Sequence, residues 1–322
     1  MIQNSEYQDK YPYQAQMLAN KVKKRFKHLR RRFAAQHVEV FRLYDWDIPE
    51  IRAAVDWYAG HLVIAEYKRK QSTPEWLPMM GAAVAEALNV PAENLHLKER
   101  VAGIQDGSRY ERLDHTDRKV VVSERDFFFY VNLWDYVDTG LFADHRNTRQ
   151  LVRDQAGGKD FLNLYCYTGS FSCYAARGGA NTTVSVDRSE TALRWARDNM
   201  NLNGIVENKN ILFQSDTFDF LKTAEREHRS FDLAVVDPPS FSTSRDKKHD
   251  FDISADHPRL LSAVVAVMTS GSTIFFSTNH QNFEPHMDRL EITDATEITA
   301  MTIPEDYAGK KKTIHRCWKI IV

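Results

Sequence analysis

The chain opens with a regular recurrence of apolar side chains. They stand three or four positions apart, the spacing that lines one face of an α-helix. The apolar stripe consists of Ala15, Leu18, Val22, Phe26, Leu29 and Phe33. Between these positions lie eight basic residues with no acid among them: Lys21, Lys23, Lys24, Arg25, Lys27, Arg30, Arg31 and Arg32. The pattern predicts an amphipathic helix with a strongly basic face within residues 1–36.

The period of the apolar positions then changes. Short stretches alternate between apolar and polar residues as β-strands do, and one stretch over residues 75–89 returns to helical spacing. The predicted strands are Val38–Leu43, two segments around Gly60 within Ala53–Tyr67, Lys119–Glu124 and Phe127–Val131. We therefore expect residues 37–139 to form a small α+β domain.

From about residue 140 onward, short apolar runs alternate with longer segments of helical spacing. Five of the runs have the composition of buried strands: Phe161–Tyr165, Thr183–Asp187, Asn210–Gln214, Phe231–Val236 and Ser272–Ser277. Strands that alternate with helices are typical of a largely parallel sheet covered on both faces. The prediction for residues 140–322 is one α/β domain of the Rossmann-like type.

Composition places the chain among ordinary folded proteins. Of its 322 residues, 43% are hydrophobic and 27% are charged, which excludes disordered and fibrous classes. No apolar run approaches the roughly 18 residues of a membrane span, and Met1–Glu6 lacks the features of a signal peptide, so we expect a cytoplasmic protein. Three cysteines are too few for a disulfide framework, and no Cys or His pattern has zinc-ligand spacing, so no metal is expected.

The charge is unevenly distributed. The formal net charge is only −1, which does not by itself indicate a polyanionic partner. The eight basic residues of the first helix, however, could neutralise phosphates. Two interpretations are about equally supported at this point: a nucleic-acid-binding helix, or a solvated helix face that is merely basic.

Candidate ligand contacts lie at the ends of the predicted strands, where doubly wound sheets bind ligands. The first strand leads into a turn at Gly169, which lets the backbone approach a ligand closely. Asp187 ends the second strand 18 residues after Gly169, near the spacing at which an acid reaches ribose hydroxyls. Asp216 ends the third strand and could accept from an adenine amino group. Helix capping is the alternative role of both acids.

The fourth strand ends in Asp237-Pro238-Pro239-Ser240-Phe241. Two prolines fix the backbone and remove two N–H donors, so the carbonyl groups before them are held rigidly while Phe241 can face a flat substrate. The chain contains neither G-x-G-x-x-G nor G-x-x-x-x-G-K-[ST]. Their absence argues against dinucleotide and nucleoside-triphosphate sites.

Together these segments resemble the class I S-adenosylmethionine-dependent RNA methyltransferases. The resemblance rests on Leu162–Phe171, Val186–Asp187, Ser215–Asp216 and Val236–Phe241, and on Asp138–Arg146, which is similar to the T-G-x-F-x-D-x-R segment of large-subunit rRNA methyltransferases. It extends from the basic helix through Leu43–Pro49 to Ile314–Trp318. Within that family the chain is most similar to the 23S rRNA guanine-N7 methyltransferases (the RlmK group), which form the C-terminal half of bifunctional proteins.

The resemblance implies a seven-stranded domain that binds S-adenosylmethionine and releases S-adenosylhomocysteine. It implies that Asp187 binds the ribose, that Asp216 lies near the adenine and that the Tyr167-Thr168-Gly169 turn lies beside the methionine part. Further implied donor-site residues are Phe142, Asp144, Arg146, Asn163, Arg188 and Asp237. Asp237, Pro238 and Phe241 would hold the target base.

The implied partner is 23S rRNA or a large-subunit precursor, with a 7-methylguanosine product in the peptidyl-transferase region. The basic helix would bind this RNA through the eight residues given above. No second methyltransferase module precedes the matched region, so guanine-N2 methylation is not implied. A separate guanine-N2 methyltransferase module is a further candidate partner.

The target atom can be argued from the cysteines. Methylation of cytosine C5 requires a thiolate nucleophile, yet the ends of the fourth and fifth strands, Asp237–Ser240 and Phe276–His280, contain no cysteine. Guanine N7 carries a lone pair and needs only alignment and exclusion of water. N7 is therefore favoured over C5, while methylation of an exocyclic amino group stays open. Outside this class, a nicotinamide-dependent dehydrogenase and a non-catalytic RNA-binding protein are the alternatives.

Overall fold

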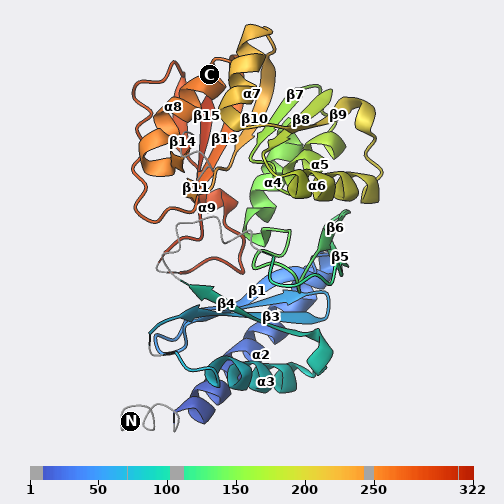
Figure 1. The fold of residues 1–322 in the computed structure, drawn as a ribbon, viewed down its shortest axis with the longest axis vertical. Coiled ribbons are helices and arrows are strands. Elements are labelled where there is room, and N and C mark those ends of the chain that lie inside the picture. Colours follow the sequence, from blue (N-terminus) through green and yellow to red (C-terminus); the bar gives the residue numbers. More distant parts are fainter. Residues whose placement is uncertain (1–9, 71, 102–111, 243–249, 311) are drawn as a thin grey trace. The chain divides into compact units, whose positions relative to one another are not determined.

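The computed structural model describes residues 10–70, 72–101, 112–242, 250–310 and 312–322. Residues 1–9, to which the signal-peptide argument applied, lie outside this set. The chain divides into two compact units, the first ending at Thr139 and the second running from Gly140 to Val322. Each unit is described on its own (Figure 1).

The first unit is built on the predicted amphipathic helix. Helix α2 spans Tyr11–Ala35, with Pro12 in its first turn, where the missing N–H of proline costs no helical hydrogen bond. Its buried side chains include Ala15, Leu18, Val22, Leu29 and Phe33, and Phe26 is partly buried against the same core. The predicted apolar stripe is confirmed. Because α2 packs on the sheet that follows it, the described part of the predicted segment 1–36 shares one core with the small domain.

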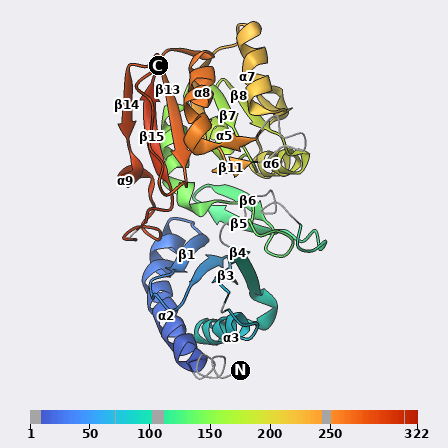
Figure 2. The same cartoon turned by 60° about the vertical axis from the view of Figure 1, so that its left-hand side comes forward.

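A four-stranded sheet forms the other layer of this unit. Its order is β1 (Val40–Asp45), β2 (Ala53–Tyr58), β3 (His61–Lys68), β4 (Leu95–Val101). Neighbours are antiparallel except β3 and β4, which are parallel and joined through α3 (Trp76–Leu88). Helices α2 and α3 lie together on one side of the sheet in Figures 1 and 2. A hairpin of β5 (Val120–Glu124) and β6 (Phe127–Val131) completes the unit.

The second unit contains a seven-stranded sheet, which confirms the predicted Rossmann-like α/β class. The strand order is β14-β15-β13-β10-β7-β8-β9. The strands are β7 (Asp160–Leu164), β8 (Thr182–Asp187), β9 (Asn210–Gln214), β10 (Phe231–Val236), β13 (Met268–Thr278), β14 (Asp294–Glu297) and β15 (Arg316–Ile321). The five predicted strands are the five parallel ones, and β15 runs antiparallel to both of its neighbours.

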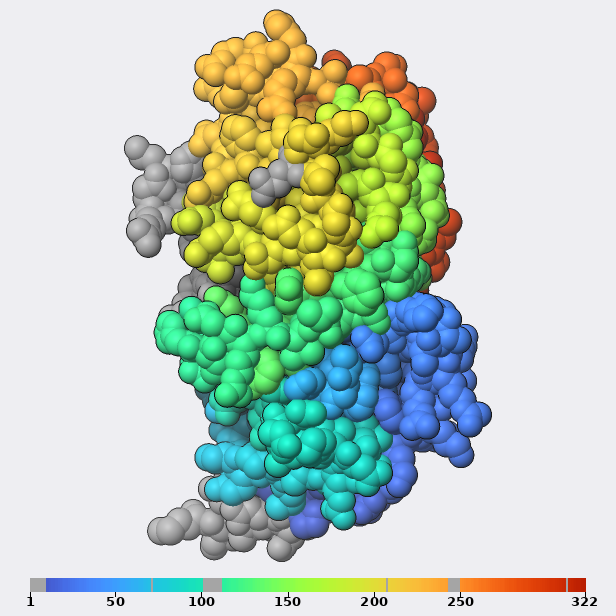
Figure 3. All heavy atoms as spheres, turned by 90° about the vertical axis from the view of Figure 1, so that its right-hand side faces the viewer, coloured from blue at the N-terminus to red at the C-terminus, as the bar shows by residue number. Residues whose placement is uncertain are grey.

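Helices cover both faces of this sheet. Alternate strand residues point to opposite faces, so Leu162 and Leu164 pack toward α7 (Thr217–Arg226) and α8 (Ile253–Val265), whereas Phe161 packs toward α4 (Arg146–Gln155) and α5 (Ser170–Arg177). Helix α6 (Glu190–Leu202) packs on α5, and the short α9 (Thr299–Thr302) contacts α4. Figure 3 shows the edge of the sheet around β9 at the surface, in yellow.

Several shorter elements lie in the connecting segments of the two units. They are the 3₁₀ turns Ala92–Asn94, Ala143–His145 and Glu207–Lys209, and a two-stranded ribbon of β11 (Phe241–Ser242) and β12 (Phe251–Asp252). Within the described residues, no helix is long and apolar enough to cross a membrane.

Candidate functional site

Three parallel strands of the second unit end side by side at the point where the strand order reverses. Strand β7 lies between β8 and β10, so the loops after Leu164, Asp187 and Val236 leave the same edge of the sheet. Crevices at such reversals are the usual ligand sites of open α/β sheets. The Tyr167-Thr168-Gly169 turn, Asp187 and Asp237 lie at the ends of these three strands, and Asp216 follows the neighbouring β9.

The loop after β7 is a tight turn held by its neighbours. Tyr165, Tyr167 and Gly169 have positive φ angles of 56°, 49° and 73°, a conformation that is uncommon for tyrosine and clusters at functional sites. A Cβ on Gly169 would lie 2.8 Å from the Cβ of Ala196, so only glycine fits there. The Thr168 hydroxyl donates to the Gly140 carbonyl at 2.6 Å.

Thr168, within this turn, and Asn163, on the strand before it, have buried side chains. The Asn163 amide donates to Ser172 Oγ at 2.8 Å, and Asn199 donates to the Thr168 carbonyl at 2.9 Å. Their predicted contact with the methyl donor stays a prediction. The Thr168 side chain joins the turn to Gly140, whereas Asn163 joins the end of β7 to Ser172 on α5.

Asp187 ties the second strand end to this turn. Its Oδ2 accepts from the backbone N–H of Tyr167 and its Oδ1 from that of Ser189, both at 2.9 Å. Burial raises the pKa of Asp187, and the backbone hydrogen bonds oppose that shift. Ser189, not Asp187, is the residue that caps α6. The capping alternative is therefore wrong for Asp187.

For Asp216 the capping role is confirmed. Its carboxylate accepts from the N–H groups of Phe218 and Asp219 at the start of α7. Arg188 Nε, on an exposed side chain, lies 3.9 Å from Asp216 Oδ2. Both capping hydrogen bonds end on Oδ1. The geometry is compatible with a contact between Asp216 and the donor, and that contact stays a prediction.

The segment from Phe142 to Arg146 contributes one exposed ring and a buried charged network. The Phe142 side chain is 45% exposed, and its ring centroid lies 5.4 Å from that of Tyr167 in the turn. Arg146 is only 2% exposed, and its Nη1 donates to Asp306 at 3.1 Å. Asp144 Oδ2 is 2.9 Å from His315 Nδ1. Phe142 is thus placed to touch a ligand, whereas the charges of Asp144 and Arg146 face protein partners.

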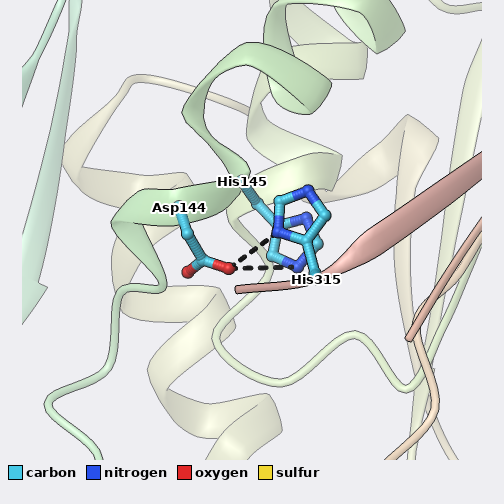
Figure 4. Close-up of side chains that lie close together, drawn as sticks. All are labelled: Asp144, His145 and His315. Atoms are coloured by element: carbon cyan, nitrogen blue, oxygen red, sulfur yellow. Dashed lines mark hydrogen bonds and ion pairs between the residues drawn. The ribbon is translucent and has the colours of Figure 1, made fainter. Parts of the chain in front are cut away.

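His145 was not singled out from the sequence, yet it connects this network to the fourth strand end. The His145 and His315 rings stack with centroids 4.1 Å apart, and both face the Asp144 carboxylate (Figure 4). His145 Nε2 also lies 3.5 Å from Asp237 Oδ2. The other oxygen of Asp237 accepts from Ser277 Oγ at 2.6 Å. Asp237 is therefore held from two sides, with part of its side chain still open to solvent.

The protonation state of His145 follows from its surroundings. Burial lowers the pKa of His145, and the His315 ring lowers it further, while Asp237 and Asp144 act in the opposite direction. Its Nδ1 has no hydrogen-bond partner within the described residues. A neutral imidazole beside the carboxylate leaves the negative charge of Asp237 uncompensated from this side.

Replacing His145 by glutamine should make stability less dependent on pH. A histidine with a lowered folded-state pKa stabilises the fold above its unfolded pKa of about 6.5. As pH falls below that value only the unfolded chain takes up the proton, so stability is lost by up to about 1.4 kcal/mol per pH unit. Urea denaturation near pH 7 and near pH 5.5 measures this loss, with exposed His28→Gln as the control. An identical loss in wild type and His145→Gln would contradict the assignment.

Asp144, His145 and His315 also satisfy the geometry of a metal-binding group, since their ligand atoms lie within 4.8 Å of one another. His315 Nδ1 pairs with Asp144 and its Nε2 lies 3.1 Å from the Thr302 hydroxyl. Hydrogen bonds therefore account for the orientation of this ring. The sequence contained no spacing signal for the cluster, because 171 residues separate Asp144 from His315. That no metal binds here stays a prediction.

The Asp237–Phe241 segment continues away from the sheet. Pro238 is buried, and Phe241 is partly exposed on β11, which pairs with β12. The Ser240 hydroxyl donates to Asn279 Oδ1 at 2.6 Å. Phe241 thus lies on a short ribbon beyond the end of β10. Its predicted role is not tested by these contacts.

Comparison with known proteins decides the class. Residues 44–306 match the family model described as S-adenosylmethionine-dependent methyltransferase. The chain belongs to this methyltransferase family. This methyltransferase is 40% identical over 311 residues to the ribosomal RNA large subunit methyltransferase K of Neisseria meningitidis serogroup B, which covers 94% of this chain and 86% of the relative. The predicted resemblance is confirmed, and the dehydrogenase alternative is excluded.

Longer relatives and solved structures extend the comparison. The methyltransferase is 38% identical over 317 residues to the ribosomal RNA large subunit methyltransferase K/L of Colwellia psychrerythraea, of which it spans 42%. The crystal structure of SMU.776 complexed with SAH has a TM-score of 0.77 at 22% identity, covering 97% of this chain and 82% of that one. That likeness shows the fold.

S-adenosylmethionine is the cofactor of this methyltransferase. The chemistry of the strand ends fits it. Asp187 offers a carboxylate whose two oxygens can accept from vicinal hydroxyls, at the edge where the Gly169 turn brings backbone close. The partly exposed Tyr167 and the exposed Phe142 supply apolar surface beside that turn. The residues present are therefore suited to a nucleoside with a charged, flexible tail.

Proposed function

We propose that this methyltransferase transfers the methyl group to N7 of a guanine in the peptidyl-transferase region of 23S rRNA. The observation that carries the RNA substrate is the 40% identity, over 94% of the chain, with a ribosomal RNA large subunit methyltransferase K. The K/L relatives are longer proteins, and we take from them only the part that this chain matches.

The cysteines support a nitrogen target over cytosine C5. Cys166, Cys173 and Cys317 are all buried and free. Burial raises the pKa of all three thiols, in the case of Cys173 to about 12. A thiol of this kind is neither ionised nor accessible, so it cannot add to a cytosine ring. The cytosine-C5 alternative therefore lacks its nucleophile in this chain.

Asp237 is the side chain best placed to favour attack by N7. The bound donor supplies an electrophilic methyl group, and a guanine methylated at N7 carries a positive charge. The Asp237 carboxylate, oriented by Ser277 and adjoining a neutral His145, offers negative charge where that positive charge develops. Pro238 and Pro239 keep the backbone after Asp237 rigid, and Phe241 offers a surface for the unstacked base.

The basic face of α2 is proposed to bind the RNA backbone. Of its eight cationic side chains, all except Arg25 are exposed, and Arg25 is partly exposed. Lys21 lies 3.9 Å from Asp47, a surface pair that leaves the cation accessible to solvent. Clustered exposed cations on one helix face neutralise successive phosphates. This arrangement favours the nucleic-acid interpretation over a merely solvated face.

Replacing Phe241 by alanine should lower turnover about 10-fold or more while donor affinity changes less than about threefold. A lost stacking surface for one base is worth ~1–3 kcal/mol, and this surface lies beyond the donor turn. Steady-state methylation of rRNA and calorimetric titration with S-adenosylmethionine measure the two effects. Phe213→Ala, which removes an exposed ring on β9, is the control. Unchanged turnover in Phe241→Ala would exclude this role.

The deciding experiment identifies the product. The purified chain is incubated with labelled S-adenosylmethionine and unmodified 23S rRNA, which is then digested to nucleosides for mass spectrometry. Labelled 7-methylguanosine is the expected result. Labelled 5-methylcytidine would refute the cysteine argument, and labelled N2-methylguanosine would move the target to the exocyclic amino group. Donor binding and RNA binding with no product would favour a non-catalytic protein.

A further inference from the structure

A groove in the first unit lies beside the C-terminal half of α2. It has a volume of about 550 Å³ and is bounded by α2, β1, β2 and Ser123 on β5. We call it the α2 groove and define it by Phe26, Arg30, Arg31, His37, Glu39 and Trp57. Its size is in the range of small-ligand pockets.

The floor of the α2 groove is aromatic. The Phe26 and Trp57 rings lie 4.6 Å apart at 49° to each other, and both side chains are partly exposed. Phe41 lies in the same aromatic cluster, 6.3 Å from Phe26 and 6.4 Å from Trp57, and is only 3% exposed. Packing against the core therefore holds the Phe26 and Trp57 rings in place. Partly exposed, rigid rings of this kind are stacking surfaces for flat groups.

The rim of the groove is cationic. Arg30 and Arg31 are exposed, and the Arg30 guanidinium lies 5.7 Å from the centre of the Phe26 ring. Within the part of the chain that the structure describes, neither arginine makes an ion pair with an acid. The acidic side chain on the rim, Glu39, accepts from the backbone N–H of Ser123 at 2.9 Å. The groove therefore presents two accessible guanidinium groups next to two ring faces.

We propose that the α2 groove binds one unpaired nucleotide of the RNA substrate, with the phosphate on Arg30 and Arg31 and the base stacked on Trp57 or Phe26. This inference rests on the proposed function, since it assumes an RNA substrate. A concave site with an aromatic floor fits a base that is out of its helix, because bases within a duplex present only their edges. Guanidinium groups beside rings are the usual companions of such stacking surfaces.

The inference gives the basic face of α2 and the α2 groove different roles. Its basic face as a whole attracts the RNA backbone without regard to structure, whereas the groove distinguishes single-stranded from paired segments. The groove belongs to the first unit, so its loss should raise the KM for RNA. The turnover number and donor affinity should change less than about threefold, because the residues that carry them lie in the second unit.

The test uses the full chain and a ten-nucleotide single-stranded RNA of mixed sequence. Ultraviolet cross-linking followed by mass spectrometry is expected to place the RNA on the peptide that contains Trp57 or on the one that contains Phe26. Affinity for the oligonucleotide should fall at least about fivefold in Trp57→Leu and in Arg30→Gln/Arg31→Gln. The control is Lys222→Gln/Arg226→Gln, which removes two exposed cations from α7 and should leave affinity unchanged.

Folding and function are separated by two further measurements. Thermal denaturation identifies a variant that fails to fold. If Trp57→Leu fails to fold, Arg30→Gln/Arg31→Gln still tests the proposal, because both arginines are exposed. Cross-links confined to other peptides, or equal affinity of the arginine and control variants for the oligonucleotide, would contradict nucleotide binding in the α2 groove. If the wild-type protein binds the oligonucleotide in the α2 groove but methylates no rRNA, the nucleotide site is supported and the proposed function is contradicted. If it methylates rRNA but the oligonucleotide does not bind in the groove, the proposed function is supported and the nucleotide site is contradicted.

Discussion

Replacing Asp187 by alanine is expected to weaken S-adenosylmethionine binding by about 100-fold or more. In the structure this carboxylate holds the N–H groups of Tyr167 and Ser189, and its remaining acceptor capacity is available to the donor ribose. Hydrogen bonds to a charged acceptor contribute ~1.5–3 kcal/mol each, and the change removes several at once. Two such bonds to the ribose correspond to a loss of about 100-fold or more. Calorimetric titration of the purified variant gives the affinity directly.

The matched control for this change is Asp219→Ala, which removes an acid from the first turn of α7 and should leave donor affinity within about threefold of wild type. Thermal denaturation of both variants separates lost binding from lost folding. If Asp187→Ala folds and binds the donor with wild-type affinity, Asp187 has only the structural role of joining two loops.

Replacing Asp237 by asparagine is expected to lower turnover by about 100-fold or more. Asparagine preserves the size of the side chain and can still accept from Ser277, but it removes the negative charge beside His145. Removal of one preorganised polar group aimed at a developing charge, such as an oxyanion-hole donor, typically costs 100- to 1,000-fold in rate, or ~2.7–4 kcal/mol. Single-turnover methylation at saturating donor isolates this step from product release.

The control is Asp154→Asn on α4, where the exposed carboxylate accepts only from Gln150 in the described structure. Its single-turnover rate should equal that of wild type. A variant Asp237→Asn that turns over normally but binds the donor poorly would assign Asp237 to the donor rather than to the target base.

The elements that the sequence predicted are those whose burial pattern is regular. Helix α2 was found because its apolar positions recur with a fixed period, and the five parallel strands because each is a short apolar run between helical segments. Strand β4 was missed because it buries polar side chains: His96 is 7% and Lys98 only 4% exposed. Burial lowers the pKa of Lys98 to about 8, and Lys98 donates to the Tyr136 carbonyl. A strand stabilised by such distant partners has no local signature.

The candidate site was predicted in the same uneven way. Gly169, Asp187 and Asp237 could be located because each follows a recognisable strand. The contacts of His145 could not, because its neighbours His315 and Asp237 come from other parts of the chain. The family resemblance implied Asp144 and Arg146 as donor-site residues. Their charges meet His315 and Asp306, and their contact with the donor stays a prediction. The partners of a buried charge depend on long-range packing.

The three cysteines have a practical consequence. Cys166 lies in the turn after β7, Cys173 in α5 and Cys317 in β15, and all are buried. A buried, protonated thiol reacts with an alkylating reagent only when its surroundings open. The labelling rate of each cysteine therefore reports how often that part of the second unit opens. The protein thus carries three intrinsic probes of local unfolding, one of them inside the turn expected to hold the methyl donor.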